Sequence, residues 1–322
     1  MTLFARISLG FLLFPVYQFA FSQTFPDRPV RFVVVDSSGA AVDIVARLLS
    51  EQLGGKWPQR VVVENRPGAS GTIAANLVAK AKPDGYTYLL TGTYTEAIVP
   101  YAMQLLPYDY QKDLIPVAEI ARLPFVLVSP KDSKLRTLKD VEALARTKPN
   151  GITVGGMPRG SSLHLTWEII AQQLGIPSVY VAYNAANQLL GDLVGGQFDM
   201  AITSISSVRP LIQSGRAQGM ATTSRSRSSS LPGVPTLEEN GLANMEVIVW
   251  VGVMAPAGTP ADRLAFVEKS LIEAAQSDFV KMRLSEFGYL VTGRSGADLA
   301  ETIRQDRIRF EPLVKRLGLK ME

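Results

Sequence analysis

The feature of this chain that most limits its fold is a regular alternation of short apolar runs with segments of helical periodicity. The first apolar run, 30–35, is rich in β-branched residues and predicts a buried strand. Apolar residues recur at helical spacing over 42–53, and two glycines then predict the end of a helix. Strands at 60–64 and 86–90, with a helix at 72–82 between them, continue the pattern. Strands that alternate with helices predict a parallel sheet covered by helices.

The alternation restarts after residue 124, which indicates a second unit of the same kind. Its expected elements are strands at 125–129, 152–154, 179–183, 198–203 and 217–222 and helices at 137–147, 162–174, 186–194 and 208–214. A further strand at 245–254 and three helical segments complete the chain. A chain of 322 residues also exceeds what one hydrophobic core usually serves. We therefore predict an α/β fold of two lobes. The chain should cross from one lobe to the other near 121–124 and return near 247–251.

The two crossings divide the chain into domains. Residues 23–123 together with 248–322 form the expected first domain, and 124–247 form the second. Residues 1–22 are expected to be a signal peptide, because one basic residue precedes an apolar run that ends at Ala20-Phe21-Ser22, with small residues at the cleavage positions. The alternative is a membrane anchor, but 7–21 is short for a span of about 20 residues. The mature chain should then be a soluble protein of the periplasm.

Composition excludes several classes of function. The chain has no cysteine, which removes disulfides, thiolate nucleophiles, zinc–thiolate sites and a lipid anchor on cysteine. A formal net charge of +4 gives no reason to expect a nucleic-acid partner, which calls for a clustered basic face. One histidine and scattered carboxylates do not supply the ligand spacing of a metal site. We expect a monomer without a cofactor.

Four loops that join strands to helices share one chemistry, because each offers small residues, hydroxyls and backbone amides beside a helix start. Such positions suit anions, since helix N-termini carry partial positive charge and unpaired donors. The candidate ligand-binding residues in these loops are Ser37, Ser38, Gly39 and Ala40; Thr93, Tyr94 and Thr95; Arg159, Gly160, Ser161 and Ser162; and Thr203 and Ser204. Each loop taken alone is more often an ordinary helix cap. The prediction rests on their meeting in one cleft beyond the carboxyl ends of the strands.

Other residues leave alternatives open. The glycine-rich loop 67–71 lacks the lysine of a P-loop. We interpret it as a turn that allows close packing, and a binding role is the less favoured alternative. Tyr94, Tyr183 and Trp250 are equally consistent with an apolar wall of the site and with the core. Glu96 is an awkward charge near an anion site and is expected to point to water. Catalysis is not expected, because the single histidine, His164, lacks the partners of a Ser–His–Asp arrangement.

Eight stretches of the chain, in this order, resemble the Bug-type receptors of tripartite tricarboxylate transporters. They are Phe25-Pro-Asp-Arg-Pro-Val-Arg31, Asp43-Ile-Val-Ala-Arg-Leu-Leu49, Val61-Val-Val-Glu-Asn-Arg-Pro-Gly-Ala-Ser-Gly71, Ala81-Lys-Pro-Asp-Gly-Tyr86, Gly160-Ser-Ser-Leu-His-Leu165, Leu193-Val-Gly-Gly-Gln197, Leu231-Pro-Gly-Val-Pro-Thr236 and Ala255-Pro-Ala-Gly-Thr-Pro260. The resemblance implies the two-domain type II fold of periplasmic binding proteins. It also implies that a carboxylate or amino acid is captured between the domains and delivered to a membrane permease.

The resemblance adds three candidates and marks three departures. The family's first loop ends in an aspartate, which is Asp43 here, and its Tyr-Lys-Gly motif is Tyr183-Asn184-Ala185. Ala40 stands where the family has glycine, Asn184 where it has lysine, and Glu96 where a neutral residue or histidine is usual. The lost lysine suits a ligand with less negative charge than a di- or tricarboxylate. A sensory receptor on the same fold is the alternative function, and an enzyme is a more remote one.

Overall fold

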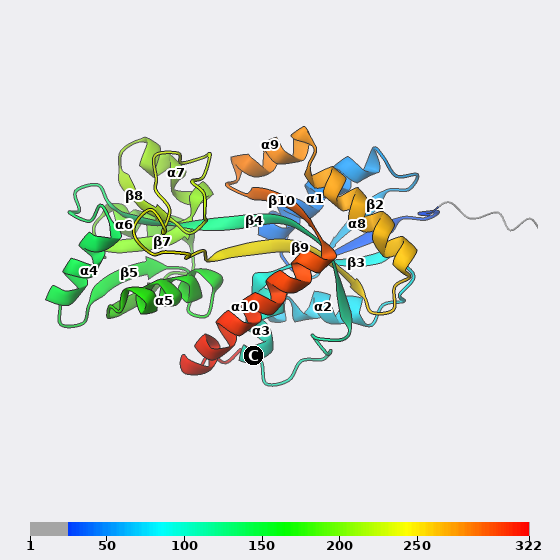
Figure 1. The fold of residues 1–322 in the computed structure, drawn as a ribbon, viewed down its shortest axis with the longest axis horizontal. Helices are drawn as coiled ribbons and strands as arrows, with labels where there is room; N and C mark the ends of the chain where they lie inside the picture. Colours follow the sequence, from blue (N-terminus) through cyan, green and yellow to red (C-terminus); the bar gives the residue numbers. More distant parts are fainter. Residues whose placement is uncertain (1–24, 322) are drawn as a thin grey trace, which may run out of the picture.

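Two strands, β4 (Leu114–Pro130) and β9 (Ile248–Pro256), run antiparallel between two groups of helices and strands (Figure 1). They belong to a computed structural model of the protein, which describes residues 25–321. The first half of β4 pairs with β9 and β10 (Leu290–Ser295), and its second half pairs with strands of the other lobe. The structure is therefore a two-lobed α/β fold, as predicted. The expected signal peptide, 1–22, lies outside the described residues.

The first lobe is built on three parallel strands. Strand β1 (Val30–Val34) lies between β2 (Val61–Asn65) and β3 (Thr87–Gly92), and it pairs with both in parallel. Their carboxyl ends meet at one edge of the sheet, where ligands of α/β proteins bind. The other elements of this lobe are α1 (Ala41–Gly54), η1 (Ala69–Gly71), α2 (Thr72–Ala79), η2 (Tyr94–Ile98), α3 (Val99–Ala102), α8 (Ala261–Ala275), α9 (Asp278–Glu286) and α10 (Gly296–Arg316).

The second lobe repeats this plan. Strand β5 (Ile152–Gly156) pairs in parallel with β6 (Ser178–Ala182) and β7 (Met200–Ser204). The remaining elements are α4 (Leu138–Thr147), α5 (Ser162–Leu174), α6 (Ala186–Val194), α7 (Ile205–Gln213) and β8 (Ala217–Thr222). Both lobes thus have parallel strands with helices between them, which confirms the reading of the alternating pattern.

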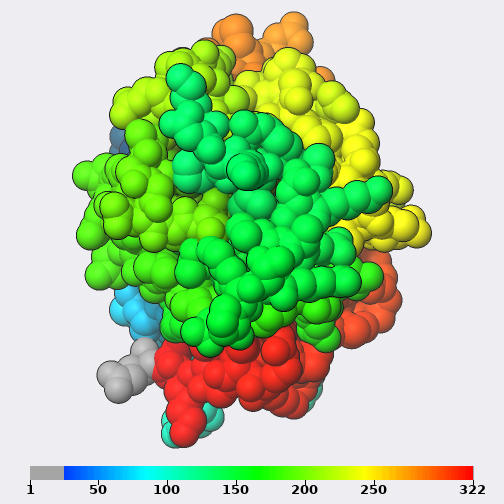
Figure 2. All heavy atoms as spheres, turned by 90° about the vertical axis from the view of Figure 1, so that its left-hand side faces the viewer, coloured from blue at the N-terminus to red at the C-terminus, as the bar shows by residue number. Residues whose placement is uncertain are grey.

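Separate apolar clusters stabilise the lobes. One is centred on buried residues such as Phe32 and Tyr88 in the first lobe, and another includes Trp167 in the second. A smaller cluster joins them, because Leu165 of α5 packs against Phe310 and Leu313 of α10. Figure 2 shows the C-terminal end of the chain, in red, lying against the second lobe, in green. The lobes are therefore in contact on this side of the molecule.

Several expected boundaries were wrong. The strand expected at 125–129 is the second half of β4, which begins at Leu114 because Pro116 is tolerated beside a bulge in the pairing with β9. The helix expected at 72–82 ends at Ala79. Strand β10 and the helical turns η2 and α3 were not foreseen. Among residues 25–321, no helix combines the length and the apolar composition that crossing a bilayer requires.

Candidate functional site

A cavity of about 370 Å³ lies at the carboxyl ends of the parallel strands of the first lobe. Its size falls within the range of small-molecule sites. Most of its wall comes from the first lobe and from the crossing strands β4 and β9, and Ser162 is the contribution of the second lobe. The lining residues are Val35, Asp36, Ser37, Ala41, Val42, Pro67, Gly68, Ser70, Gly71, Gly92, Thr93, Tyr94, Thr95, Leu123, Ser162, Val249, Trp250 and Val251.

The loop after β1 forms one side of the cavity through Asp36 and Ser37. Three further candidates of this loop, Ser38, Gly39 and Ala40, do not line it. Gly39 has a φ of 82°, a left-handed conformation that glycine adopts without strain. The loop therefore brings its first residues to the cavity and turns its tip away.

Asp43 fixes the shape of this loop through hydrogen bonds. Its buried carboxylate accepts hydrogen bonds from the Gly39 amide at 2.7 Å, from Asn65 Nδ2 at 2.8 Å and from Arg47 Nε at 2.8 Å. Burial opposes its ionisation, but these hydrogen bonds outweigh burial and lower the pKa of Asp43. Asp43 does not line the cavity, so it positions the loop.

The loop after β3 contributes three of the predicted residues, Thr93, Tyr94 and Thr95. Thr93 Oγ1 accepts a hydrogen bond from the backbone amide of Trp250 at 2.9 Å, which leaves its own hydroxyl proton free to donate. Thr95 Oγ1 donates to the carbonyl of Ser70 at 3.3 Å. Hydroxyl groups and an aromatic ring thus meet in this part of the wall.

Glu96, the next residue, does not point to water, and that expectation was wrong. Its side chain is fully buried, and Oε1 accepts a hydrogen bond from Thr91 Oγ1 at 3.0 Å. Burial raises the pKa of Glu96 to about 7, against the smaller opposing effects of Thr91 and Arg307. The residue lies behind the cavity wall, because the helical turn η2 carries it into the contact with α10.

The loop after β2, for which the sequence favours a packing turn, lines the cavity through Pro67, Gly68, Ser70 and Gly71. Gly71 has a φ of 90°, and a Cβ atom there would lie 2.4 Å from Thr95 Oγ1. The glycine therefore allows the close approach of two cavity loops. The parallel position of β2 beside β1 was the available signal, since it brings this loop to the same sheet edge.

The loop before α5 reaches the cavity through Ser162 alone. Ser161 caps the helix by accepting from the His164 amide at 3.3 Å, and the Gly160 amide donates to His164 Nδ1 at 3.0 Å. Arg159 Nη2 donates to the Tyr180 carbonyl at 3.1 Å. These three candidates therefore serve the local structure of the second lobe.

His164 is a buried packing residue in this arrangement. Burial, together with the nearby charge of Arg159, lowers its pKa to about 4, so the ring is neutral near pH 7. The Ser161 hydroxyl oxygen accepts from the His164 backbone and makes no hydrogen bond to the ring. Within residues 25–321, no group of three or more His, Asp or Glu side chains is placed to hold a metal ion.

The remaining candidates of the second lobe stand outside the cavity. Tyr183 is buried and its hydroxyl donates to Asp192 Oδ2 at 2.8 Å, while Asn184 is exposed. Thr203 lies buried in β7, and Ser204 caps α7. The four loops of the prediction do not converge in this conformation. The second lobe meets the cavity at the start of α5 only.

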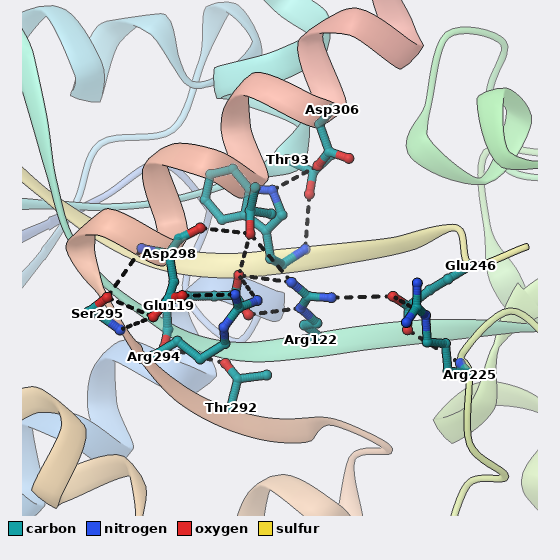
Figure 3. Close-up of polar contacts among 12 residues, drawn as sticks. Thr93, Glu119, Arg122, Arg225, Glu246, Thr292, Arg294, Ser295, Asp298 and Asp306 are labelled. Atoms are coloured by element: carbon teal, nitrogen blue, oxygen red, sulfur yellow. Dashed lines mark hydrogen bonds and ion pairs between the residues drawn. The ribbon is translucent and has the colours of Figure 1, made fainter. Parts of the chain in front are cut away.

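Trp250 forms part of the apolar wall and is held by two polar contacts. Its ring nitrogen donates to Asp306 Oδ2 at 2.9 Å, and its backbone amide donates to Thr93 (Figure 3). Burial raises the pKa of Asp306 to about 6, against the opposing charge of Arg309 and the bond from Trp250. The same region contains Arg122, whose guanidinium bonds Glu119 at 2.8 Å and Glu246 at 3.4 Å. These contacts tie the crossing strands to α10 and to each other.

The chain is similar to known proteins over most of its length. A family model described as the tripartite tricarboxylate transporter family receptor matches residues 45–319. A UPF0065 protein of Bordetella bronchiseptica is 35% identical over 301 residues, which cover 93% of this chain and 88% of the relative. Protein BugT of Bordetella pertussis is 32% identical over 302 residues, which cover 94% and 93%.

Solved structures show the same similarity. The R. palustris protein Rpa4515, solved with adipate, is 30% identical with a TM-score of 0.75, and the match covers 92% of this chain and 99% of that one. MatC from Rhodopseudomonas palustris, with bound malate, is 29% identical with a TM-score of 0.71, over 90% and 100% of the two chains. The periplasmic binding protein BugD is 28% identical with a TM-score of 0.71, over 92% and 100%.

Proposed function

The chain belongs to the receptor family of tripartite tricarboxylate transporters, and on that premise we propose that it captures a small organic carboxylate or amino acid outside the cytoplasm. The ligand binds between the two lobes and is handed, chemically unchanged, to a membrane transporter of that type. A signal peptide at residues 1–22 directs export, and the mature protein acts in the periplasm as a monomer without a cofactor.

The observation that carries this proposal is the position of the cavity. It lies at the carboxyl ends of β1, β2 and β3, and Ser162 of the other lobe faces it from the first turn of α5. A ligand in contact with both sides favours the closed arrangement of the lobes through its differential affinity for that state. The lobes, 23–123 with 248–322 and 124–247, then move about β4 and β9.

The wall of the cavity suits a carboxylate that is held by neutral donors. Ser162 lies at the N-terminus of a helix of 13 residues, where amides and the helix dipole favour negative charge. Ser70, Thr93 and Thr95, which also carry hydroxyl groups, line the same cavity from the first lobe. Two similar proteins were solved with adipate and with malate, which are both small carboxylates. Among the predicted residues we retain Ser37, Thr93, Tyr94, Thr95 and Ser162 as ligand contacts.

A thermal-shift panel of carboxylates and amino acids tests the proposal on the mature chain, which begins at Gln23. Binding to the folded state raises the melting temperature by mass action. We expect a rise with at least one acid, a dissociation constant from calorimetry, and recovery of the intact ligand after incubation. Conversion of the ligand, or silence across the whole panel, would count against a receptor for small acids. Loss of uptake by cells that lack the gene then tests delivery to a transporter.

A further inference from the structure

The charge of the cavity wall is unusual for a site that receives an acid. Of the described residues that line the cavity, none is lysine, arginine or histidine. Asp36 is the only aspartate or glutamate among these lining residues. A ligand with two carboxylates would bring two negative charges to a wall that already has one. Like charges in a partly buried site repel more strongly than in water. The wall therefore disfavours a dicarboxylate.

Asp36 has one carboxylate oxygen available to a ligand. Oδ2 accepts the amide of Val42 at 2.9 Å and so caps the start of α1, where Ala40 provides no side-chain cap. Oδ1 accepts no hydrogen bond from residues 25–321. Capping explains the position of the side chain but engages only one of its two oxygens. The side chain that carries the other oxygen is half-buried on the cavity wall.

No cation of the described chain neutralises Asp36. Arg47, which pairs with the neighbouring Asp43, also bonds Asn65 and Ser38, and its side chain is about half exposed. Asp43 adds a second negative charge, and the Tyr289 hydroxyl donates to the carbonyl of Ala41. Burial raises the pKa of Asp36, the Val42 amide opposes that rise, and Asp43 reinforces it. A ligand that brings a positive charge would relieve this cost.

We propose, on the basis of the receptor function above, that Asp36 selects ligands that carry a primary ammonium group together with a carboxylate. The cavity then takes an amino acid and discriminates against dicarboxylates. The ammonium group donates to Asp36 Oδ1, and the carboxylate accepts from the hydroxyls of Thr93 and Ser162. The apolar part of the ligand packs on Leu123, Val249 and Trp250, which line the same cavity.

Matched ligand pairs test this proposal by calorimetry on the mature protein. Each α-amino acid is compared with the acid of the same carbon skeleton that lacks the amino group, and ω-amino acids such as 4-aminobutanoate are compared with butanoate. Adipate and malate serve as dicarboxylate probes. We expect at least one amino acid to bind ten times or more tightly than its deaminated partner. That factor is about the strength of one hydrogen bond to a charged group.

Variants of Asp36 assign the discrimination to this residue. Asp36→Asn keeps an oxygen to cap Val42 and removes the charge, so the preference for the amino acid should fall about tenfold. Asp36→Ser also removes the charge and can cap a helix. It controls for any local effect of the asparagine side chain in the first variant. The matched control is Asp262→Asn, which removes an exposed charge from the first turn of α8 in the same lobe and should leave the preference unchanged.

The outcomes separate this inference from the receptor function. If a deaminated acid or a dicarboxylate binds at least as tightly as every amino acid, the selectivity is overturned while the receptor function stands. A preference for an amino acid that survives both Asp36 variants also overturns the role of Asp36. If no acid of any class binds, the receptor function fails and the selectivity fails with it.

Discussion

Thr93 Oγ1 accepts a hydrogen bond of 2.9 Å from the backbone amide of Trp250, so the loop after β3 is fixed to the crossing strand β9 inside the cavity wall. The contact is close as well as polar, because a Cβ atom on Gly92 would lie 2.7 Å from the carbonyl oxygen of Trp250. Both residues of the hydrogen bond are almost fully buried. A change at Thr93 should therefore affect the cavity wall and the crossing strand together.

Replacement of Thr93 by valine keeps the shape of the side chain and removes the acceptor. The buried amide of Trp250 then lacks a partner, which costs about 1–3 kcal/mol in the free energy of unfolding. Urea denaturation measures this loss, and calorimetry should show weaker ligand binding. Thr147→Val, on an exposed position of α4, is the control and should change stability by less than about 0.5 kcal/mol. Equal stability of the two variants would show that the Thr93–Trp250 bond contributes nothing.

Ser161 and Ser162 are neighbours with different roles, and alanine at each should separate binding from stability. Ser161 caps α5, so Ser161→Ala should lower stability by about 1 kcal/mol with little change in affinity. Ser162 lines the cavity, so Ser162→Ala should weaken ligand binding by roughly 2- to 13-fold, the range for one neutral hydrogen bond. Calorimetry and thermal unfolding of both variants check this. The reverse pattern would place the ligand away from Ser162.

Glu96 should make the free energy of unfolding fall as pH rises. Its pKa in the folded protein is about 7, above the ordinary value of 4.5, because burial disfavours the charged form. The folded state therefore holds the proton more tightly, and the stabilisation is fully present below pH 4.5. It is lost as pH rises through about 7, and it amounts to no more than about 3 kcal/mol.

Glu96→Gln isolates this effect, because glutamine keeps an oxygen to accept from Thr91 and does not titrate. Urea denaturation of both proteins at several values between pH 4.5 and 8 measures the difference. Asp306, whose pKa is also raised, acts in the same direction in both proteins and cancels. A constant difference across this range would mean that Glu96 does not titrate there.

Arg122 should be more important for stability than any exposed arginine of the chain. It pairs with Glu119, which is fully buried, and with Glu246 at the start of the second crossing (Figure 3). Arg122→Met leaves the Glu119 charge with Thr302 and a more distant Arg294, at a cost of about 3 kcal/mol. Urea denaturation measures the cost.

The double variant Glu119→Gln with Arg122→Met should recover part of that loss, since it removes the unpaired charge. Arg304→Met, which breaks an exposed pair with Glu301, is the control and should cost less than about 1 kcal/mol. If the Arg122 variant is no less stable than the Arg304 variant, the buried pair has no stabilising role.

The two-lobed α/β fold could be predicted because strand and helix periodicities differ and alternate along the chain. The bounds of α5 and α6 agree with the sequence expectation, since the serine cap of α5 and the glycines that follow both helices are local signals. Strand β4 was underestimated because proline within a run normally argues against a strand. Strand β10 was missed because its pairing partner, β4, is distant in sequence.

The cavity could be predicted only in part. Loops that follow parallel strands line this cavity, and Ser37, Thr93, Tyr94, Thr95 and Ser162 are the predicted residues among its lining; that they bind the ligand stays a prediction. The sequence does not reveal which face of a loop points inward, so Ser38 and Gly39 were included although they lie outside the cavity. Asp36 begins the first of these loops but was not among the candidate residues, and an acid beside a helix start is usually no more than a cap.

The sequence by itself determined the order of most strands and helices, the division into two lobes and the family, because these follow from local periodicity and from motifs in a fixed order. Only the tertiary structure decided the charge of the cavity and the burial of Glu96. Those properties depend on which distant segments exclude water from a side chain. Within residues 25–321 no cation pairs with the carboxylate of Asp36, while Arg47 is paired with Asp43, four residues before it. No pattern along the chain shows that arrangement.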